Sequence, residues 1–143
     1  MKYQIVVFVL TAFFSCKSSI EKRVARQANK CQNENCKVRV ADLTDFQWDK
    51  MVVFNYSISD AVVNDAIWFD YKNYDDQTRP WIFIKNNRIV YAENNPAGIE
   101  GPVEGEVAFD GPDSLKFMVY TPKTAIFSVK KETANNKSYY LLH

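Results

Sequence analysis

Carboxylates are the side chains in this sequence that could most directly perform catalysis. The candidates form two groups, Asp42, Asp45 and Asp49 before an apolar run, and Asp70, Asp75 and Asp76 in a polar segment rich in tyrosine. Glycoside hydrolysis needs only two carboxyl groups about 5 to 9 Å apart. One hypothesis is therefore a small carboxylate-dependent enzyme acting on cell-wall glycan. Solvated loops and turn caps are the simpler interpretation of the same acids.

Other kinds of chemistry find little support. The one histidine is His143, the last residue, which removes most acid–base and metal schemes. Gly98, Gly101 and Gly105 match no phosphate-binding loop, and the glutamates between them would repel phosphate. With 18 basic and 17 acidic side chains in 143 residues, no block of positive charge predicts nucleic-acid binding. The segment around Asp70 lacks EF-hand spacing. We predict no cofactor, metal, nucleotide or nucleic acid.

The N-terminus has the layout of an export signal. Lys2 precedes an apolar run over residues 5–14, and Ser15-Cys16 follows it. The run is too short to span a bilayer, which takes about 20 apolar residues. Ser15-Cys16 resembles the lipobox of bacterial lipoproteins, which implies removal of residues 1–15 and lipidation of Cys16. By resemblance to enteric sorting rules, Lys17 implies the outer membrane, facing the periplasm. Ordinary secretory cleavage shortly after Cys16, giving a soluble periplasmic or secreted protein, is the alternative.

Two cysteines remain after such processing, Cys31 and Cys36. In an exported protein this pair predicts a disulfide. The ring is small, so in the chain-entropy account the bond contributes only about 2 kcal/mol and fixes a local turn. Free thiols are the main alternative. Zinc would need further ligands, and a redox pair of the thioredoxin type would need two intervening residues.

One phrase of the sequence is similar to a known group of proteins. It consists of Asp42-Leu43-Thr44, Phe46, Trp48-Asp49-Lys50, an apolar strand and Asn55-Tyr56. This phrase resembles a stretch common in small bacterial lipoproteins that have no assigned activity. The resemblance covers about residues 40–70 and contains no catalytic motif. The resemblance supports the predicted export and lipid anchoring, and it implies nothing about the activity.

Aromatic residues are the feature that most favours a function. The chain has 21 of them, and several lie beside acidic residues in polar segments. Exposed Tyr and Trp bury a large area at low entropic cost, as protein-binding surfaces require. We therefore predict a protein-binding surface formed by Tyr71, Tyr74, Asp75, Asp76 and Trp81. This makes a non-catalytic, immunity-like or inhibitor-like binding protein the preferred hypothesis. A core position is the alternative for Trp81 and for Trp68.

The first half of the chain predicts two helices. Ile20, Val24 and Ala28 recur at four-residue spacing, which indicates a short helix capped by Ser18 or Ser19. Strands are predicted at 37–40 and 50–55. A second helix of about ten residues is expected after Ser57, with Asp60 in capping-box position. Its predicted apolar face comprises Ile58, Ala61, Val62 and Ala66.

The second half predicts strands joined by turns. A hairpin at 80–93 turns at Asn86-Asn87, and further strands are expected at 106–109, 114–120, 124–132 and 137–143. Strands joined by short turns pair antiparallel. The predicted fold class is therefore α+β, an antiparallel sheet of five to seven strands with one or two helices packed on one face. Residues 16–36 would form a lipid-anchored segment with a short helix and the disulfide loop, and 37–143 a single domain.

Overall fold

The computed structural model describes residues 18–31, 36–98, 100–112 and 115–143. The predicted processing site at Cys16 lies outside these residues. A short 3-10 helix occupies Val40–Leu43. The helices and strands are α1 (Ile20–Asn29), β1 (Lys37–Arg39), β2 (Lys50–Val53), α2 (Asp60–Ile67), β3 (Thr78–Lys85), β4 (Arg88–Pro96), β5 (Val107–Phe109), β6 (Met118–Tyr120), β7 (Ile126–Ala134) and β8 (Lys137–Leu142).

The strands form two sheets. One has the order β1-β7-β8-β5 and is mixed; the other has the order β4-β3-β2-β6 and is antiparallel. The α+β class is confirmed, whereas the single antiparallel sheet of five to seven strands is wrong. The chain leaves the second sheet after β6 and enters the first at β7 through a turn in which the Ala125 amide bonds the Thr121 carbonyl. Because β5 and β8 are not consecutive, they can pair parallel.

Two Asn-Asn turns close the long hairpins. Asn86 and Asn87 have φ of 49° and 56°, and Asn135 and Asn136 have φ of 52° and 61°. Asparagine tolerates this left-handed region better than most residues, and two such residues in succession make the tight turn that suits twisted strands. The hairpin prediction is confirmed for β3 and β4, and the turn predicted between β7 and β8 is confirmed as well.

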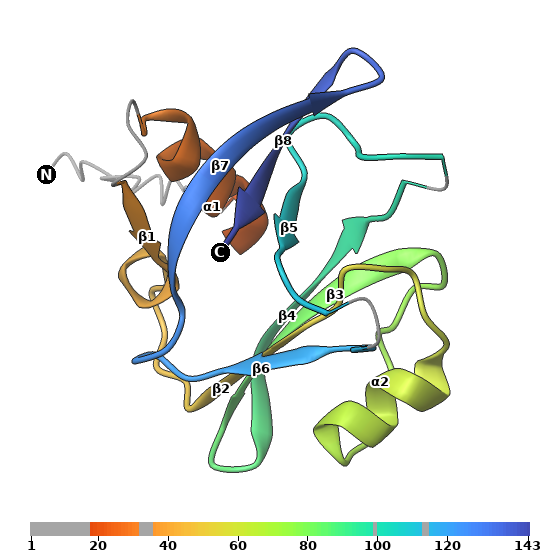
Figure 1. The fold of residues 1–143 in the computed structure, drawn as a ribbon. Coiled ribbons are helices and arrows are strands. Elements are labelled where there is room, and N and C mark those ends of the chain that lie inside the picture. The colour runs from red at the N-terminus through yellow and green to blue at the C-terminus, as the bar shows by residue number, and fades with distance from the viewer. Residues whose placement is uncertain (1–17, 32–35, 99, 113–114) are drawn as a thin grey trace, which may run out of the picture.

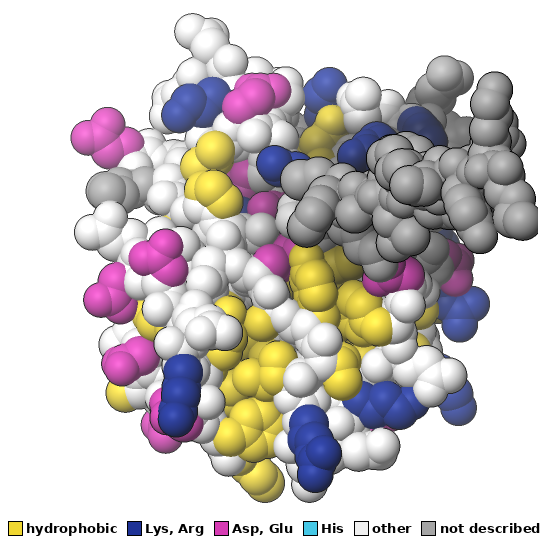
Figure 2. Space-filling model, turned by 180° about the vertical axis from the view of Figure 1, so that it is seen from behind, with side chains coloured by type: hydrophobic (Ala, Val, Ile, Leu, Met, Phe, Trp, Pro, Cys, Tyr) yellow, Lys and Arg dark blue, Asp and Glu magenta, His cyan; other side chains and the backbone are white. Residues whose placement is uncertain are grey.

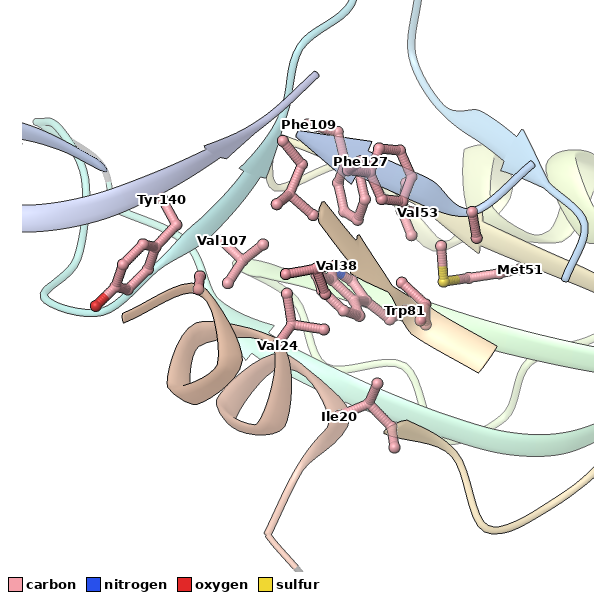
Figure 3. Packing of buried hydrophobic residues seen from close by; sticks show 14 of the residues in the cluster. Ile20, Val24, Val38, Met51, Val53, Trp81, Val107, Phe109, Phe127 and Tyr140 are labelled. Carbon is pink, nitrogen blue, oxygen red and sulfur yellow. The ribbon is translucent and has the colours of Figure 1, made fainter. Parts of the chain in front are cut away.

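Helix α1 packs against the core between the sheets. Ser19 is its N-cap, and its Oγ accepts a hydrogen bond from the Lys22 amide. The predicted stripe of Ile20, Val24 and Ala28 is buried. In Figure 3, Val24 points toward Val38 and Trp81, with β-strand side chains such as Phe109 and Phe127 above them. Burial of this stripe is what stabilises a helix of only three turns.

Helix α2 exists where predicted but presents a different face. It begins at Asp60 after Ser59, so the Ser57 capping box is wrong. Val63 and Ile67 are its buried positions, while Ala61 is exposed. They pack with sheet residues such as Val52 and Ile82. The buried stripe is thus displaced by one residue, about 100° around the helix, although Ile58 and Ala66 of the predicted face are half-buried against the same cluster.

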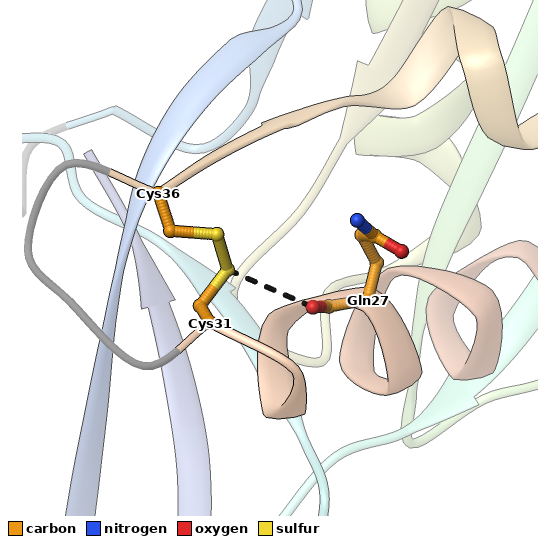
Figure 4. The surroundings of a disulfide bond; sticks show 3 residues. All are labelled: Gln27, Cys31 and Cys36. Carbon is orange, nitrogen blue, oxygen red and sulfur yellow. Dashed lines mark hydrogen bonds between the residues drawn. A yellow bond between two sulfur atoms is a disulfide. The ribbon is translucent and has the colours of Figure 1, made fainter.

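The predicted disulfide joins Cys31 to Cys36, with 5.4 Å between their Cα atoms. The Cys31 Sγ lies 3.6 Å from the Gln27 carbonyl oxygen in the last turn of α1 (Figure 4). The bond therefore connects the end of α1 to the start of β1, in agreement with its predicted role of fixing a local turn.

A buried ion-pair cluster, absent from the sequence-based predictions, ties α1 to both sheets. The Arg79 side chain on β3 is 1% exposed, and its Nη2 lies 2.7 Å from the Glu21 carboxylate on α1. Its Nε lies 3.4 Å from Glu106, and its Nη1 donates to the Val107 carbonyl at 3.0 Å. The Glu21 carboxylate also accepts the Val107 amide, so side chains occupy the outer edge of β5 at this point. Burial raises the pKa of Glu21, opposed by the attraction of Arg79.

A second carboxylate, Glu93 on β4, binds the start of α1. Its two oxygens accept the Ile20 and Glu21 amides at 2.6 and 2.8 Å. It also accepts the Tyr91 hydroxyl at 2.7 Å. The first amides of a helix lack partners within the helix, and a carboxylate there is favoured by the helix dipole. Thus α1 is fixed to the sheets through its side chains and through its N-terminal backbone.

Candidate protein-binding site

Helix α2 covers only part of the outer face of the sheet β4-β3-β2-β6. It has 8 residues, about 12 Å of helix. Four strands are about 14 Å wide, and β3 and β4 are considerably longer than α2. A second apolar cluster forms beneath the helix: Val52, Phe54, Val63, Ile67, Tyr71, Ile82 and Ile84. Beyond this cluster, toward the edge strand β6, the described residues leave the sheet exposed at Val119.

A groove of about 450 Å³ lies between α2 and the uncovered edge of this sheet. We call it the α2–β6 groove. It is lined by Lys50, Val52, Ala66, Ile67, Trp68, Phe69, Ile84, Asn87, Phe117 and Val119. Most of these side chains are apolar, and Val119 on β6 is 48% exposed. Contiguous exposed apolar surface of this kind marks interaction sites on soluble domains.

Trp68 stands at the edge of this groove, directly after the last turn of α2. Its side chain is 89% exposed. Its backbone is left-handed, with φ 66° and ψ 26°, and its amide bonds the Asn64 carbonyl at 2.7 Å. Glycine is the usual residue at this position, and a bulky residue there is strained by about 1 kcal/mol or more. Neither burial nor backbone preference accounts for a tryptophan here.

One cation borders the groove. Lys50, at the start of β2, is exposed and lines it. It forms no ion pair with another residue of the described part of the chain. The groove therefore combines an apolar floor, a projecting indole and one free ammonium group.

The structure separates the five residues predicted to form a binding surface. The predicted exposure of Tyr71 is wrong, since it is 7% exposed and lies in the cluster under α2. Its amide bonds the Asn64 side chain at 2.8 Å, and its hydroxyl donates to Asn94 at 3.3 Å. The left-handed turn at Trp68 reverses the chain, so the residues that follow return to the sheet. Burial raises the pKa of Tyr71.

Trp81 also belongs to the core, since it is 0% exposed and packs between the sheets. The predicted surface position of Trp81 is therefore also wrong, and the alternative, a core position, is confirmed. β3 is a central strand buried on both faces, so every side chain from Arg79 to Ile84 is enclosed. Such a strand has no exposed face on which Trp81 could lie.

Tyr74 and the two aspartates stay at the surface. Tyr74 is half-buried and donates its hydroxyl to the Ile58 carbonyl, and burial is the main cause of its raised pKa. Asp75 and Asp76 are exposed and line a shallow polar cavity with Asp60 and Asp70. No group of three potential metal-binding side chains occurs within the described ranges. The loop that carries Asp75 and Asp76 therefore forms an acidic rim at the surface beside α2, and its two tyrosines, Tyr71 and Tyr74, are fixed by burial and hydrogen bonds.

The acids that suggested an enzyme have structural partners or surface positions. Asp49 accepts the Asn86 amide at 2.8 Å, and Asp42 lies 4.0 Å from Arg39. A larger cleft of about 630 Å³, which we call the β5–β8 cleft, is lined by Ala108, Tyr139 and Leu141 on the face of these strands that points away from the core. The acids that line it are Glu106 and Asp110. Glu106 contacts Arg79, and Asp110 pairs with His143 at 2.8 Å.

Sequence reasoning did not select Trp68, although a signal for it existed. In α2 the buried positions are Val63 and Ile67, four residues apart. A tryptophan at the next position after Ile67 falls off that stripe by about 100°. Trp68 also lies off the centre of the predicted face of Ile58, Ala61, Val62 and Ala66, so helix geometry in either register indicates a position at the margin of the buried face or outside it.

Comparisons with known proteins add no relative: no protein-family model, no curated protein and no solved structure matches the chain. The similarity to small bacterial lipoproteins therefore stays a prediction. Neither helix in the described residues has the length and apolar character needed to cross a bilayer.

Proposed function

We propose that this protein is a non-catalytic binding protein, immunity-like or inhibitor-like, whose partner protein docks on the α2–β6 groove. The observation that carries this proposal is Trp68, a tryptophan that is 89% exposed in a strained backbone conformation beside an apolar groove. Interface hot spots are enriched in tryptophan, and a partner that covers the indole and the groove would remove both from water.

The partner that fits this site presents an apolar side chain flanked by acidic residues. The apolar group would fill the groove between Phe69 and Val119, and a carboxylate would face the unpaired Lys50. The strand β6 at the edge of the groove is an edge strand, so its outer side is also accessible to an incoming segment. The acidic rim of Asp75 and Asp76 would lie outside this contact.

The test of the proposal replaces Trp68 by glycine. Glycine suits the left-handed backbone, so the variant should fold with equal or slightly higher stability. Affinity for the partner should fall by about 2 kcal/mol or more, as for a hot-spot tryptophan. The partner is captured by crosslinking from the cell envelope, and its affinity for both forms is then measured with purified components.

Tyr56→Ala is the matched control, because Tyr56 is 51% exposed but lines the β5–β8 cleft instead. This variant should bind as the unchanged protein does. A partner bound equally by the Trp68→Gly variant would remove the groove as the binding site. Loss of binding in the Tyr56→Ala variant alone would transfer the site to the β5–β8 cleft.

We also propose that the mature chain begins at Cys16 and is anchored by lipid in the outer membrane, facing the periplasm. The support is the apolar run that ends at Ser15-Cys16. Mass spectrometry of membrane-extracted protein should find an N-terminal Cys16 carrying diacylglycerol. An unmodified N-terminus at Met1, or at a residue after Cys16, would contradict the anchor and would leave the groove proposal unaffected.

A further inference from the structure

The solvent face of α1 carries only positive charge. Lys22, Arg26 and Lys30 follow one another at four-residue spacing, so they lie along one side of the helix and its C-terminal end. All three are exposed, on the side away from the buried stripe of α1. The one acid of the helix, Glu21, is turned inward to Arg79. We call Lys22, Arg26 and Lys30 the α1 basic stripe.

These three cations have no ion-pair partner within the described part of the chain. Arg23, next to the stripe, is different, because it donates to the carbonyls of Ser18 and Leu43. The whole chain is close to neutral, with 18 basic and 17 acidic side chains, so a face with three unpaired cations is a local excess. On the rear face, several Lys and Arg side chains lie in the upper part, on the side where α1 lies, and others lie along the lower edge (Figure 2).

We infer that the α1 basic stripe docks on the anionic headgroups of a membrane and thereby orients the domain. This inference rests on the proposed attachment at Cys16. Ile20, the first residue of α1, follows Cys16 by four positions, a reach of at most about 14 Å. A lipid on Cys16 therefore keeps the first turn of α1 near the headgroups. A helix lying along the surface would bring its basic residues within the Debye length of about 8 to 10 Å over which anionic lipid attracts them.

Because α1 is firmly attached to the core, docking of this helix on a membrane would fix the orientation of the whole domain. Arg79 and Glu93 hold the helix through side-chain and backbone contacts, so α1 moves with both sheets. α1 packs on the inner cluster between the sheets, whereas α2 packs on the outer face of β4-β3-β2-β6. The two helices lie at opposite ends of the molecule (Figure 1). With α1 on the bilayer, the α2–β6 groove faces away from it and is open to a partner.

Acetylation of lysines by a water-soluble reagent tests this orientation. Protein extracted from membranes is reconstituted into vesicles of phosphatidylcholine alone, or of phosphatidylcholine with phosphatidylglycerol. Mass spectrometry then follows each lysine at low extents of reaction. At low salt, Lys22 and Lys30 should react about threefold more slowly in the anionic vesicles, and high salt should remove the difference. The exposed Lys72, Lys116 and Lys123 are internal controls and should react equally in both.

Charge reversal at the middle of the stripe adds a second readout. Arg26→Glu should reduce the protection of Lys22 and Lys30 in anionic vesicles. Equal reactivity of these two lysines in both vesicle types, or an equal decrease at all five lysines, would overturn the inference. Flotation of the vesicles before labelling distinguishes failure of the docking from failure of the lipid attachment. Protein that floats with the vesicles but has unprotected lysines refutes the docking alone. Protein that does not bind the vesicles refutes both the attachment and the docking.

Discussion

Replacement of Arg79 by methionine is expected to lower the free energy of unfolding by about 3 to 5 kcal/mol, because it leaves a buried carboxylate without its counter-charge. Arg79 is 1% exposed, and Glu21 at 2.7 Å would keep only the Val107 amide among its present donors. Methionine fills much of the same volume, so the loss reports the charge cluster more than a cavity. Urea denaturation of the two proteins measures the difference.

The pH dependence of this deficit identifies its cause. Burial raises the pKa of the Glu21 carboxyl in the folded state, and the attraction of Arg79 opposes this rise, so removal of Arg79 should raise that pKa further above its unfolded value. A carboxyl whose pKa is higher in the folded state than in the unfolded state lowers the stability at pH values above its unfolded pKa. This destabilisation decreases as the pH falls toward the unfolded pKa. The Arg79→Met deficit should therefore shrink on acidification. A deficit independent of pH would indicate a packing defect instead.

Two control variants complete this test. Glu21→Gln combined with Arg79→Met removes both charges and should recover part of the lost stability, since paired removal of buried charges is tolerated better than removal of one. Arg88→Met, at the exposed start of β4, should change the stability by less than about 0.5 kcal/mol. An Arg79→Met protein as stable as the Arg88→Met protein would contradict a stabilising role for the cluster.

Local features of the fold could be predicted because neighbouring residues determine them. The stripe of Ile20, Val24 and Ala28 specifies α1, and the Asn86-Asn87 pair specifies a tight hairpin. The pairing of Cys31 with Cys36 followed from the small number of cysteines. In each case the decisive interactions lie within a few positions along the chain.

Contacts between residues far apart in the sequence could not be predicted from local patterns. The division into two sheets depends on the pairing of β5 with β8 and of β6 with β2. The strands of each pair are far apart in sequence. The Arg79 cluster joins residues 58 positions apart, and no local pattern indicates that Arg79 is enclosed. Consequently, the predicted hairpin began at residue 80 and left Arg79 outside it, whereas β3 begins at Thr78.

The candidate site shows how one turn of the chain changes a functional prediction. A core position was one alternative for Trp68, while its neighbours in the tyrosine loop were assigned to the surface. The αL turn at Trp68 reverses the chain and returns Tyr71 to the sheet. The predicted surface at residues 71–81 and the observed groove therefore share no residue, although Trp68 and Phe69 of the groove directly precede the tyrosine loop.

The two tryptophans Trp68 and Trp81 should give opposite results on truncation, and this is the second large effect that we expect. Trp81→Ala removes a side chain that is 0% exposed and packs on Phe109 at 5.1 Å between ring centroids. It should lower the free energy of unfolding by about 3 to 5 kcal/mol. Trp68→Gly removes an exposed side chain from a left-handed position and should raise the stability by up to about 1 kcal/mol.

Trp81→Phe keeps this comparison informative if the alanine variant does not fold. The Trp81 Nε1–H is buried and has no hydrogen-bond partner among the described residues. Phenylalanine removes that unpaired donor, which offsets part of the lost apolar contact, so the expected loss is well below that of alanine. Thermal melting of the three variants provides the measurement. If Trp68→Gly destabilised the protein as much as Trp81→Phe, the indole of Trp68 would have to be part of the packed core, and the groove would lose the residue on which the binding proposal depends.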